Sequence, residues 1–172
     1  MNKRIDPEFF HRDVLEAAPD LVGKILVHRL PDGTELRERI AEVEAYRGEE
    51  DKGCHAAKGR TRRTELLYGE SGIIYVYLCY GMHWLMNVIT GEKDQPQGLL
   101  LRAGEKFDAP AKLTKNMMID GSFNGIDLRS CEEIWFEDDG FRPSIRTAPR
   151  VGIDYAGEYW KDVEWRFIGS EE

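Results

Sequence analysis

The run IIYVYLCY at residues 73–80 restricts the fold of this chain more than any other segment. It contains no charged residue, and its β-branched and aromatic side chains favour a half-buried strand. The run is far too short to cross a membrane as a helix, which takes about 20 apolar residues. Gly81 follows as a turn signal, so residues 82–90 are predicted to pair back on it as an antiparallel partner.

The remaining elements are predicted from the same kind of pattern. Residues 24–30 and 36–46 flank the turn signal Pro-Asp-Gly and predict a second hairpin. Shorter strands are predicted at residues 98–103, 144–153 and 164–168, one or two helices at residues 9–22 around Pro19, a helix at residues 112–119, and a long ordered loop at residues 48–63. We expect one α+β domain over residues 1–172, with a mostly antiparallel curved sheet and a few short helices.

Cysteine usage and the first residues indicate the compartment. Cys54, Cys79 and Cys131 include no CxxC pair, which is typical of free thiols in a reducing environment. The first residues lack the continuous apolar run of a secretory signal. We therefore expect a cytoplasmic protein and no membrane partner.

The net charge of −8 counts against a nucleic-acid partner, because the phosphate backbone attracts lysine and arginine. The charge is unevenly distributed, however. Residues 52–91 carry five basic and two acidic side chains, a net charge of +3, whereas residues 121–172 carry six basic and twelve acidic side chains, a net charge of −6. Because the local field matters more than the sum for a bound polyanion, DNA binding stays open.

The strand RIAEVEAYR at residues 39–47 carries candidate catalytic groups. Its period of two places Glu42, Glu44 and Tyr46 on one face and small apolar residues on the other. A carboxylate beside an aromatic ring suits a pocket, but the segment alone favours a solvated strand face, because exposed glutamates are common. Glu42 and Glu44 would lie roughly 6.5 Å apart along the backbone, which also raises a carbohydrate glycosidase or nucleosidase that uses both carboxylates.

Four basic residues fall within seven positions of the loop CHAAKGRTRRT: Lys58, Arg60, Arg62 and Arg63. Arginine binds phosphate through a fork of donors, and Gly59 lets the backbone approach a ligand closely. The loop is either a clamp on a phosphate backbone or a solvated run of charge.

The apolar hairpin carries three further candidates. Tyr77 shares a strand face with Tyr75, which we expect to be core, whereas Tyr80 has the opposite parity and stands at the turn. A large ring at a turn tip can wedge between stacked bases. Asn87 lies within the apolar run LMNVI, so if buried it needs hydrogen-bond partners, and such an amide can read base edges.

Metal and cofactor motifs are missing from the sequence. The four histidines show neither zinc-finger spacing nor the signature of the zinc deaminases, and there is no P-loop or dinucleotide fingerprint. We expect neither a metal nor a cofactor.

Several segments, in this order, resemble the alkyladenine (3-methyladenine) DNA glycosylases. They are FFHRDVLEAAPDLVGKILV, EVEAYRGEEDKGCHAAKGRTRRT, GIIYVYLCYGMHWLMNV, LLLRAGE, PAKLT, NGIDL, APRVGIDYA and WRF, and together they span almost the whole chain. The resemblance implies a monofunctional enzyme that hydrolyses the N-glycosidic bond of alkylated or deaminated purines in double-stranded DNA during base-excision repair, after the nucleotide has flipped into a pocket.

The resemblance also implies roles for individual residues. Glu44 matches the general base that activates water, Arg102 the arginine beside that water, and Tyr80 the side chain that fills the space left by the flipped nucleotide. The side chains that match the base pocket are Tyr46, His55, Tyr77 and, below the base, Asn87.

The clustered arginines Arg60, Arg62 and Arg63 then belong to the DNA-facing surface. A DNA-facing enzyme of this kind needs one pocket and one wedge, so we expect a monomer. A non-catalytic binder of damaged DNA that keeps the same fold remains an alternative, beside the glycosidase that uses Glu42 and Glu44.

Overall fold

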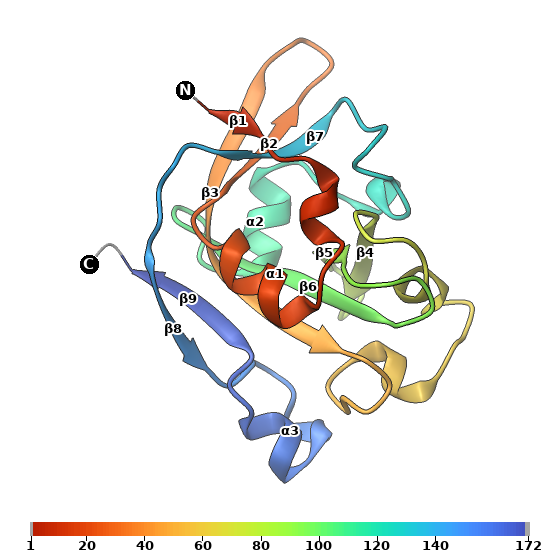
Figure 1. Cartoon of the computed structure of the whole chain (residues 1–172). Coiled ribbons are helices and arrows are strands. Elements are labelled where there is room, and N and C mark those ends of the chain that lie inside the picture. The colour runs from red at the N-terminus through yellow and green to blue at the C-terminus, as the bar shows by residue number, and fades with distance from the viewer. Residues whose placement is uncertain (1, 171–172) are drawn as a thin grey trace.

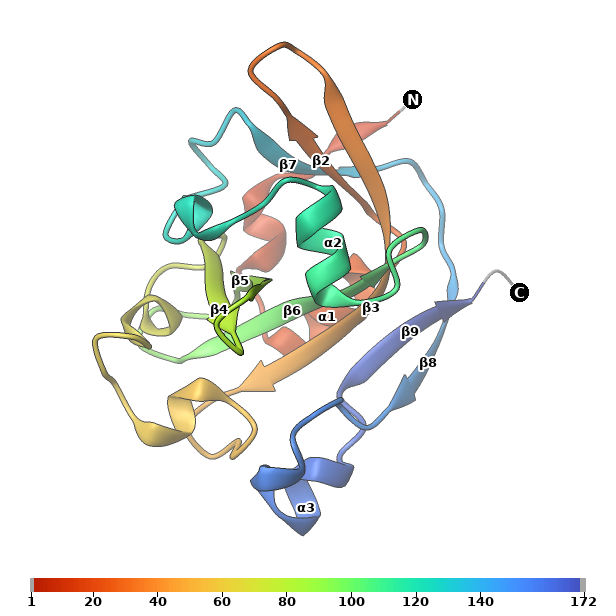
Figure 2. The same cartoon turned by 180° about the vertical axis from the view of Figure 1, so that it is seen from behind.

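The computed structural model describes residues 2–170 of the chain (Figures 1 and 2). Within this range, nine strands form an open antiparallel sheet in the order β1-β7-β2-β3-β6-β5-β4, with β9 paired to both β3 and β8. The strands are β1 (Lys3–Arg4), β2 (Ile25–Arg29), β3 (Glu35–Arg47), β4 (Ile74–Cys79), β5 (His83–Ile89), β6 (Gln97–Gly104), β7 (Ile134–Asp138), β8 (Ser144–Ala148) and β9 (Arg166–Ser170). The predicted α+β class with a mostly antiparallel sheet is confirmed.

The helices are short. The α-helices are α1 (Val14–Leu21), α2 (Pro110–Asn116) and α3 (Glu158–Asp162), and the 3₁₀ turns are η1 (Pro7–Phe10), η2 (His55–Lys58), η3 (Glu65–Tyr68), η4 (Gly121–Phe123) and η5 (Asp154–Ala156). Helix α1 packs on β3 and β6, and α2 packs on β5 and β6. Because α1 faces the viewer in Figure 1 and α2 faces the viewer in Figure 2, the two helices cover opposite sides of β6.

Strand β3 runs through the centre of the fold. It pairs with β2 over Glu35–Arg39, and its second half pairs with β6 on one side and β9 on the other. The β3–β6 ladder shifts register twice, which leaves Ala41 on β3 and Arg102 on β6 without a Cα partner. Such bulges bend a strand and redirect the side chain of the extra residue.

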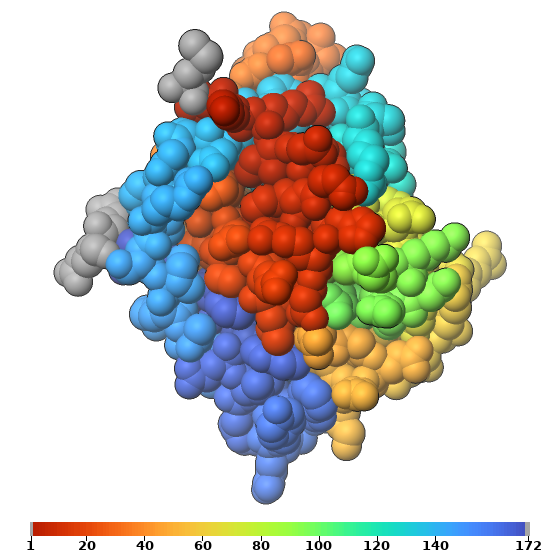
Figure 3. All heavy atoms as spheres, viewed as in Figure 1, coloured from red at the N-terminus to blue at the C-terminus, as the bar shows by residue number. Residues whose placement is uncertain are grey.

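The core lies between the sheet and its helices. In α1, Asp13 caps the N-terminus by accepting a hydrogen bond from the Leu15 backbone N–H, and the helix buries Val14, Ala17 and Leu21. Figure 3, viewed from the same side as Figure 1, shows the N-terminal residues, in red, filling the middle of the face that α1 covers. Pro19 lies inside α1 rather than dividing it, because the helix ends only two residues later and little hydrogen bonding is lost.

The structure differs from the predicted elements at several points, including β7, α3, β8 and α2. Strand β7 and helix α3 were not predicted, since each is only five residues long and leaves no clear periodic pattern. The strand predicted at residues 144–153 ends at Ala148, because Pro149 has no N–H for the ladder and Arg150 turns into the interior. Helix α2 begins at Pro110, two residues before the predicted start, where proline suits the first turn.

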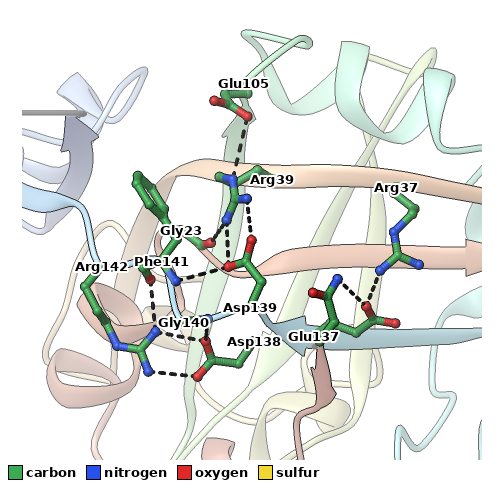
Figure 4. A network of polar contacts seen from close by, with 11 residues as sticks. Gly23, Arg37, Arg39, Glu105, Glu137, Asp138, Asp139, Gly140, Phe141 and Arg142 are labelled. Carbon is green, nitrogen blue, oxygen red and sulfur yellow. Dashed lines mark hydrogen bonds and ion pairs between the residues drawn. The ribbon is translucent and has the colours of Figure 1, made fainter.

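The first half of β3 is tied down by a polar cluster that we call the outer network (Figure 4). The Arg39 guanidinium donates to both carboxylate oxygens of Asp139, at 2.6 and 3.1 Å, and to the Gly23 carbonyl oxygen at 2.7 Å. Arg142 donates to both oxygens of the neighbouring Asp138 in the same way. The network joins β3 to the segment after β7, far from it in sequence.

The helices of residues 2–170 are all too short or too polar to span a membrane.

Candidate active site

The second half of β3 borders a cavity of about 630 Å³. Its lining residues come from strands β3 to β6, the loop before η2, the first turn of α2 and the segment at 151–155. The cavity is lined by eight of the ten predicted site residues, which are Glu44, Tyr46, His55, Arg63, Tyr77, Tyr80, Asn87 and Arg102. The structure therefore brings together residues that lie up to 58 positions apart in the sequence (44 to 102).

Glu44 is a carboxylate in the cavity wall, and only 1% of its surface is exposed. Its Oε1 accepts a hydrogen bond from the Tyr46 hydroxyl at 2.8 Å, and its Oε2 accepts one from the Val151 backbone N–H at 2.8 Å. Burial raises the pKa of Glu44, while these hydrogen bonds and the charges of Arg102 and Arg150 act in the opposite direction. A partly desolvated carboxylate with a raised pKa is suited to accept a proton from water.

Arg102 reaches this carboxylate from β6. Its Nε lies 3.8 Å from the Glu44 Oε2, and its side chain is about one quarter exposed. The register shift described above makes Arg102 the extra residue of β6 opposite β3. A bulge commonly re-aims a side chain next to a functional site, and here it brings a permanent cation beside a buried carboxylate.

Aromatic rings form one wall of the cavity. The His55 ring packs edge-on against the Tyr77 ring, with centroids 4.5 Å apart, and Tyr75 lies 5.5 Å from Tyr77. The His55 Nδ1 is 3.0 Å from the Tyr75 hydroxyl oxygen, at hydrogen-bonding distance. Burial, followed by the charges of Arg63 and Lys58, lowers the pKa of His55 to about 4, so its ring is neutral at neutral pH.

Asn87 sits on β5 in the floor of the cavity, and 6% of its surface is exposed. Its side-chain nitrogen donates a hydrogen bond to the Tyr75 carbonyl oxygen of the neighbouring strand at 3.2 Å. This bond fixes the plane of the amide. It also gives the buried side chain the hydrogen-bond partner that it needs.

Tyr80 stands at the tip of the β4–β5 hairpin at the mouth of the cavity, with 91% of its surface exposed. Its φ of +54° and the φ of +68° at Gly81 are typical of the turns that join tight hairpins. A non-glycine residue in this left-handed region costs roughly 1–2 kcal/mol. Because the side chain is so exposed, packing recovers little of this cost, and strain of this kind is often found at functional sites.

The three arginines of the basic loop have different environments. Arg60 is held by Glu65 at 2.7 Å and Asp94 at 3.0 Å. Arg63 lines the cavity, with its guanidinium carbon 6.0 Å from the centre of the Tyr77 ring. Arg62 is exposed and, within residues 2–170, has no carboxylate partner.

Glu42 does not line the cavity. Its Oε1 pairs with the Arg166 Nη1 on β9 at 2.7 Å, and the side chain stays partly exposed. Glu42 and Glu44 therefore do not flank one common space, which removes the geometric basis for a glycosidase that uses both.

Sequence reasoning missed three contributors. Asp51 and Arg150 form an ion pair whose side chains are both 0% exposed, directly behind the cavity wall, and Val151 supplies the backbone N–H to Glu44. The segment APRVGIDYA contributed to the family resemblance, but nothing in its local pattern shows that its arginine is buried. Among the described residues, no group of three or more His, Cys, Asp or Glu side chains is placed to hold a metal ion.

The family model for methylpurine-DNA glycosylase (MPG) matches residues 8–109 and 107–172. A protein of Natranaerobius thermophilus is 43% identical over 188 residues, covering 95% of this chain and 94% of its own length. A protein of Psychrobacter cryohalolentis is 38% identical, covering 97% of this chain and 92% of its own, and one of Methanocella arvoryzae is 40% identical, covering 93% and 89%.

All three relatives are provisionally named 3-methyladenine DNA glycosylases. The family model covers every residue placed in the cavity, and the relatives cover nearly the whole chain. Together with the cavity that holds Glu44, they establish that the chain belongs to the methylpurine-DNA glycosylase family.

Proposed function

We propose that this protein is a DNA glycosylase of the 3-methyladenine type, which hydrolyses the N-glycosidic bond of alkylated or deaminated purines in double-stranded DNA. The observation that carries the proposal is Glu44, the one carboxylate among the described residues that line the cavity; it is buried and faces aromatic walls, with an exposed ring at the mouth. Family membership supports the same reaction class.

The chemistry needs only water as the nucleophile. Glu44 accepts a proton from a water molecule held between it and Arg102, while the water oxygen bonds to the sugar C1′ carbon. The C1′–N bond breaks towards the base, which leaves with the bonding electrons. General-base catalysis of this kind contributes about a hundred- to ten-thousand-fold in rate.

Tyr46, His55 and Tyr77 hold the extruded base in this proposal. Their rings suit a cationic alkylated purine, because a positive ring gains cation–π attraction that an ordinary base lacks. The neutral His55 adds no repelling charge. Asn87 tests the exocyclic group of the purine from below, since its amide is already fixed by the Tyr75 carbonyl oxygen.

Tyr80 enters the stack as the nucleotide leaves it, and the basic loop contacts the phosphate backbone. Extruding a nucleotide costs a few kcal/mol, which a ring placed in the vacated space partly offsets. Arg62 and Arg63 are free of carboxylates among the described residues, whereas Arg60 braces the loop and contributes less. We propose that one monomer acts on one lesion, in the cytoplasm at the nucleoid.

The test is base release from synthetic duplexes that carry one hypoxanthine or one ethenoadenine at a defined position. The proposal expects free base and an abasic site from the duplex, and no release from an undamaged duplex. Release only from free nucleosides or sugars would instead support the nucleosidase or glycosidase alternative. Lesion-specific binding without release would show a non-catalytic binder of damaged DNA.

A further inference from the structure

The inference concerns the ion pair of Asp51 and Arg150, and it rests on the proposed function. Neither residue lines the cavity, so neither can touch a base or the attacking water. Both side chains are fully buried, with the Arg150 Nη1 and Nη2 at 2.6 and 2.8 Å from the two carboxylate oxygens of Asp51. Because the pair does not contact the substrate, its burial needs another explanation.

Stability is a weak reason for such a pair. Removing two charges from water costs several kcal/mol per ion, and apolar replacements of buried pairs are often neutral or stabilising. Asp51 is nevertheless saturated with donors, because its oxygens also accept from the backbone N–H groups of Arg47 at 3.0 Å and Gly53 at 2.9 Å. The carboxylate thus clamps the end of β3 to the loop that leads into His55.

Arg150 holds the opposite side of the same wall. Its Nη1 donates to the Ala45 carbonyl oxygen at 2.9 Å, in the peptide unit that joins Ala45 to Tyr46. Its guanidinium carbon lies 4.8 Å from the centre of the Tyr46 ring and 5.1 Å from that of Trp165. The backbone and ring of this part of β3 are therefore fixed from behind by one cation.

Both hydrogen bonds to Glu44 come from groups that Arg150 holds in place. The Tyr46 hydroxyl, which donates to Oε1, belongs to the ring beneath which the guanidinium lies. The Val151 N–H, which donates to Oε2, belongs to the residue next to Arg150 in the chain. Displacing Arg150 would move both donors at once.

We propose that the Asp51–Arg150 pair is a positioning device that orients Glu44 for proton transfer and sets the electrostatic field in which Glu44 works. Arg150 is the positive member beside Glu44, and Asp51 is the counter-ion that moderates it. Asp51 and Arg150 act through Glu44 and are not catalytic residues themselves.

The field at Glu44 has several sources besides Arg150. Arg102 faces the carboxylate from β6, and the phenol groups of Tyr46, Tyr77 and Tyr155 face it from β3, β4 and the loop at 151–155. Arg150 and Arg102 both lower the pKa of Glu44 against the effect of burial. Of these two arginines, only Arg150 has a buried counter-ion, which is Asp51. Arg150 should therefore lower the pKa of Glu44, and Asp51 should raise it.

Two variants distinguish a positioning role of the pair from a merely structural one. Arg150→Met keeps an unbranched apolar stem but removes the cation, so the pKa of Glu44 should rise by about one pH unit. Asp51→Asn keeps the shape of the pair but frees the cation from its counter-ion, so the pKa of Glu44 should fall. A merely structural role predicts loss of stability in both variants and no shifts of opposite sign.

The control is Arg39→Met, which breaks the bidentate pair of Arg39 and Asp139 in the outer network and leaves the cavity untouched (Figure 4). For the three variants and the parent, we would measure single-turnover base release from a lesion duplex against pH, and titrate the Glu44 carboxyl carbon by NMR. Arg150→Met should slow release up to roughly a hundredfold, as small misplacements of catalytic groups do, and should move the acidic limb to higher pH.

The titration is independent of activity and keeps the two proposals apart. A parent protein that releases no base from any lesion duplex overturns the proposed function. An active parent whose Glu44 titrates identically in Arg150→Met, Asp51→Asn and Arg39→Met overturns the positioning role. If Arg150→Met does not fold, a lower pKa of Glu44 in Asp51→Asn supports the inference, and an unchanged pKa refutes it.

Discussion

Strand β3 buries two glutamates, one towards each end, and only one of them meets a cavity. Glu38 is 2% exposed and Glu44 is 1% exposed, and each accepts hydrogen bonds from backbone N–H groups of a loop. The Glu38 Oε2 accepts from Lys106 at 2.9 Å and Phe107 at 3.0 Å, whereas Glu44 accepts from Val151 and from the Tyr46 hydroxyl.

The difference between the two glutamates lies in what surrounds them. A methyl group added at Gly104 would lie only 2.4 Å from the Glu38 Cγ, so the space beside Glu38 is filled by protein. Beside Glu44 there is a cavity of about 630 Å³ and the guanidinium of Arg102. Burial and backbone hydrogen bonds are therefore common to both glutamates, whereas open space and a neighbouring cation distinguish the one that we propose to be functional.

The largest expected effect separates the two glutamates by activity. Glu44→Gln should slow base release about a hundred- to ten-thousand-fold because it removes the general base. Glu38→Gln should keep the rate per folded molecule within a few-fold. Single-turnover release from a hypoxanthine duplex measures both, and equal rates for the two variants would show that Glu44 is not the base.

Glu44→Gln should not lower the stability of the fold, unlike most replacements of buried residues. Burial raises the pKa of Glu44 in the folded protein above its ordinary value of 4.5, so the folded state binds this proton more tightly than the unfolded chain does. The ionised carboxylate therefore costs stability as the pH rises from 4.5 through the folded-state pKa. At pH 7.5 the glutamine variant should unfold at the same or a higher denaturant concentration than the parent.

The next effect compares an aromatic ring at each end of the sheet. Tyr80 is exposed at the cavity mouth, whereas Trp135, near the outer network, is only 7% exposed and lies under Arg4 and Arg29. Trp135→Ala should cost about 3–5 kcal/mol of stability, as truncations of buried aromatics do. Tyr80→Ser should leave the melting temperature almost unchanged and weaken binding to a lesion duplex. A large loss of stability in Tyr80→Ser would contradict its role as a wedge.

A smaller effect tests the supporting role of Glu38. Glu38→Ala leaves the N–H groups of Lys106 and Phe107 without their acceptor, at a cost of about 1–3 kcal/mol for each buried group left unsatisfied. Denaturant unfolding measures the loss. A variant with unchanged stability would mean that water replaces the carboxylate, and that Glu38 is less enclosed than its burial indicates.

The smallest effect concerns free and paired arginines. Arg62→Ala and Arg63→Ala should each lower the slope of log affinity against log salt by roughly one, because each removes one phosphate contact. Arg60→Ala should change the slope less, since Glu65 and Asp94 already neutralise that cation. Arg39→Ala, in the outer network, is the control that should leave the slope unchanged. Unaltered slopes in Arg62→Ala and Arg63→Ala would assign the basic loop a structural role.

Most of the sheet could be predicted from local patterns, because its longer strands alternate in period two or form unbroken apolar runs. Strand β7 was missed, since three apolar residues followed by acidic ones do not make a recognisable strand. The end of β8 at Ala148 was also missed: Pro149 is a local signal for it, but the turn of Arg150 into the interior depends on Asp51, 99 residues away in sequence. A contact of that range leaves no trace in a window of neighbouring residues.

The candidate site was predicted from two sources. Period two correctly put Glu44 and Tyr46 side by side, and the family resemblance supplied distant residues such as Arg102 and Asn87. Period two also puts Glu42 on this strand face, but it could not show that Glu42 lies outside the cavity and pairs with Arg166 on β9. The bulge beside Arg102 is a property of two paired strands, so the pattern of one strand could not reveal it.

The backbone at Tyr80 has a consequence for protein engineering. Its φ of +54° favours glycine or asparagine, and 91% of the tyrosine surface is exposed, so the ring contributes little packing energy in return. A library screened for heat resistance alone should therefore enrich glycine or asparagine at position 80. Directed evolution of a more thermostable variant would need to keep Tyr80 fixed or to select for damaged-DNA binding in parallel.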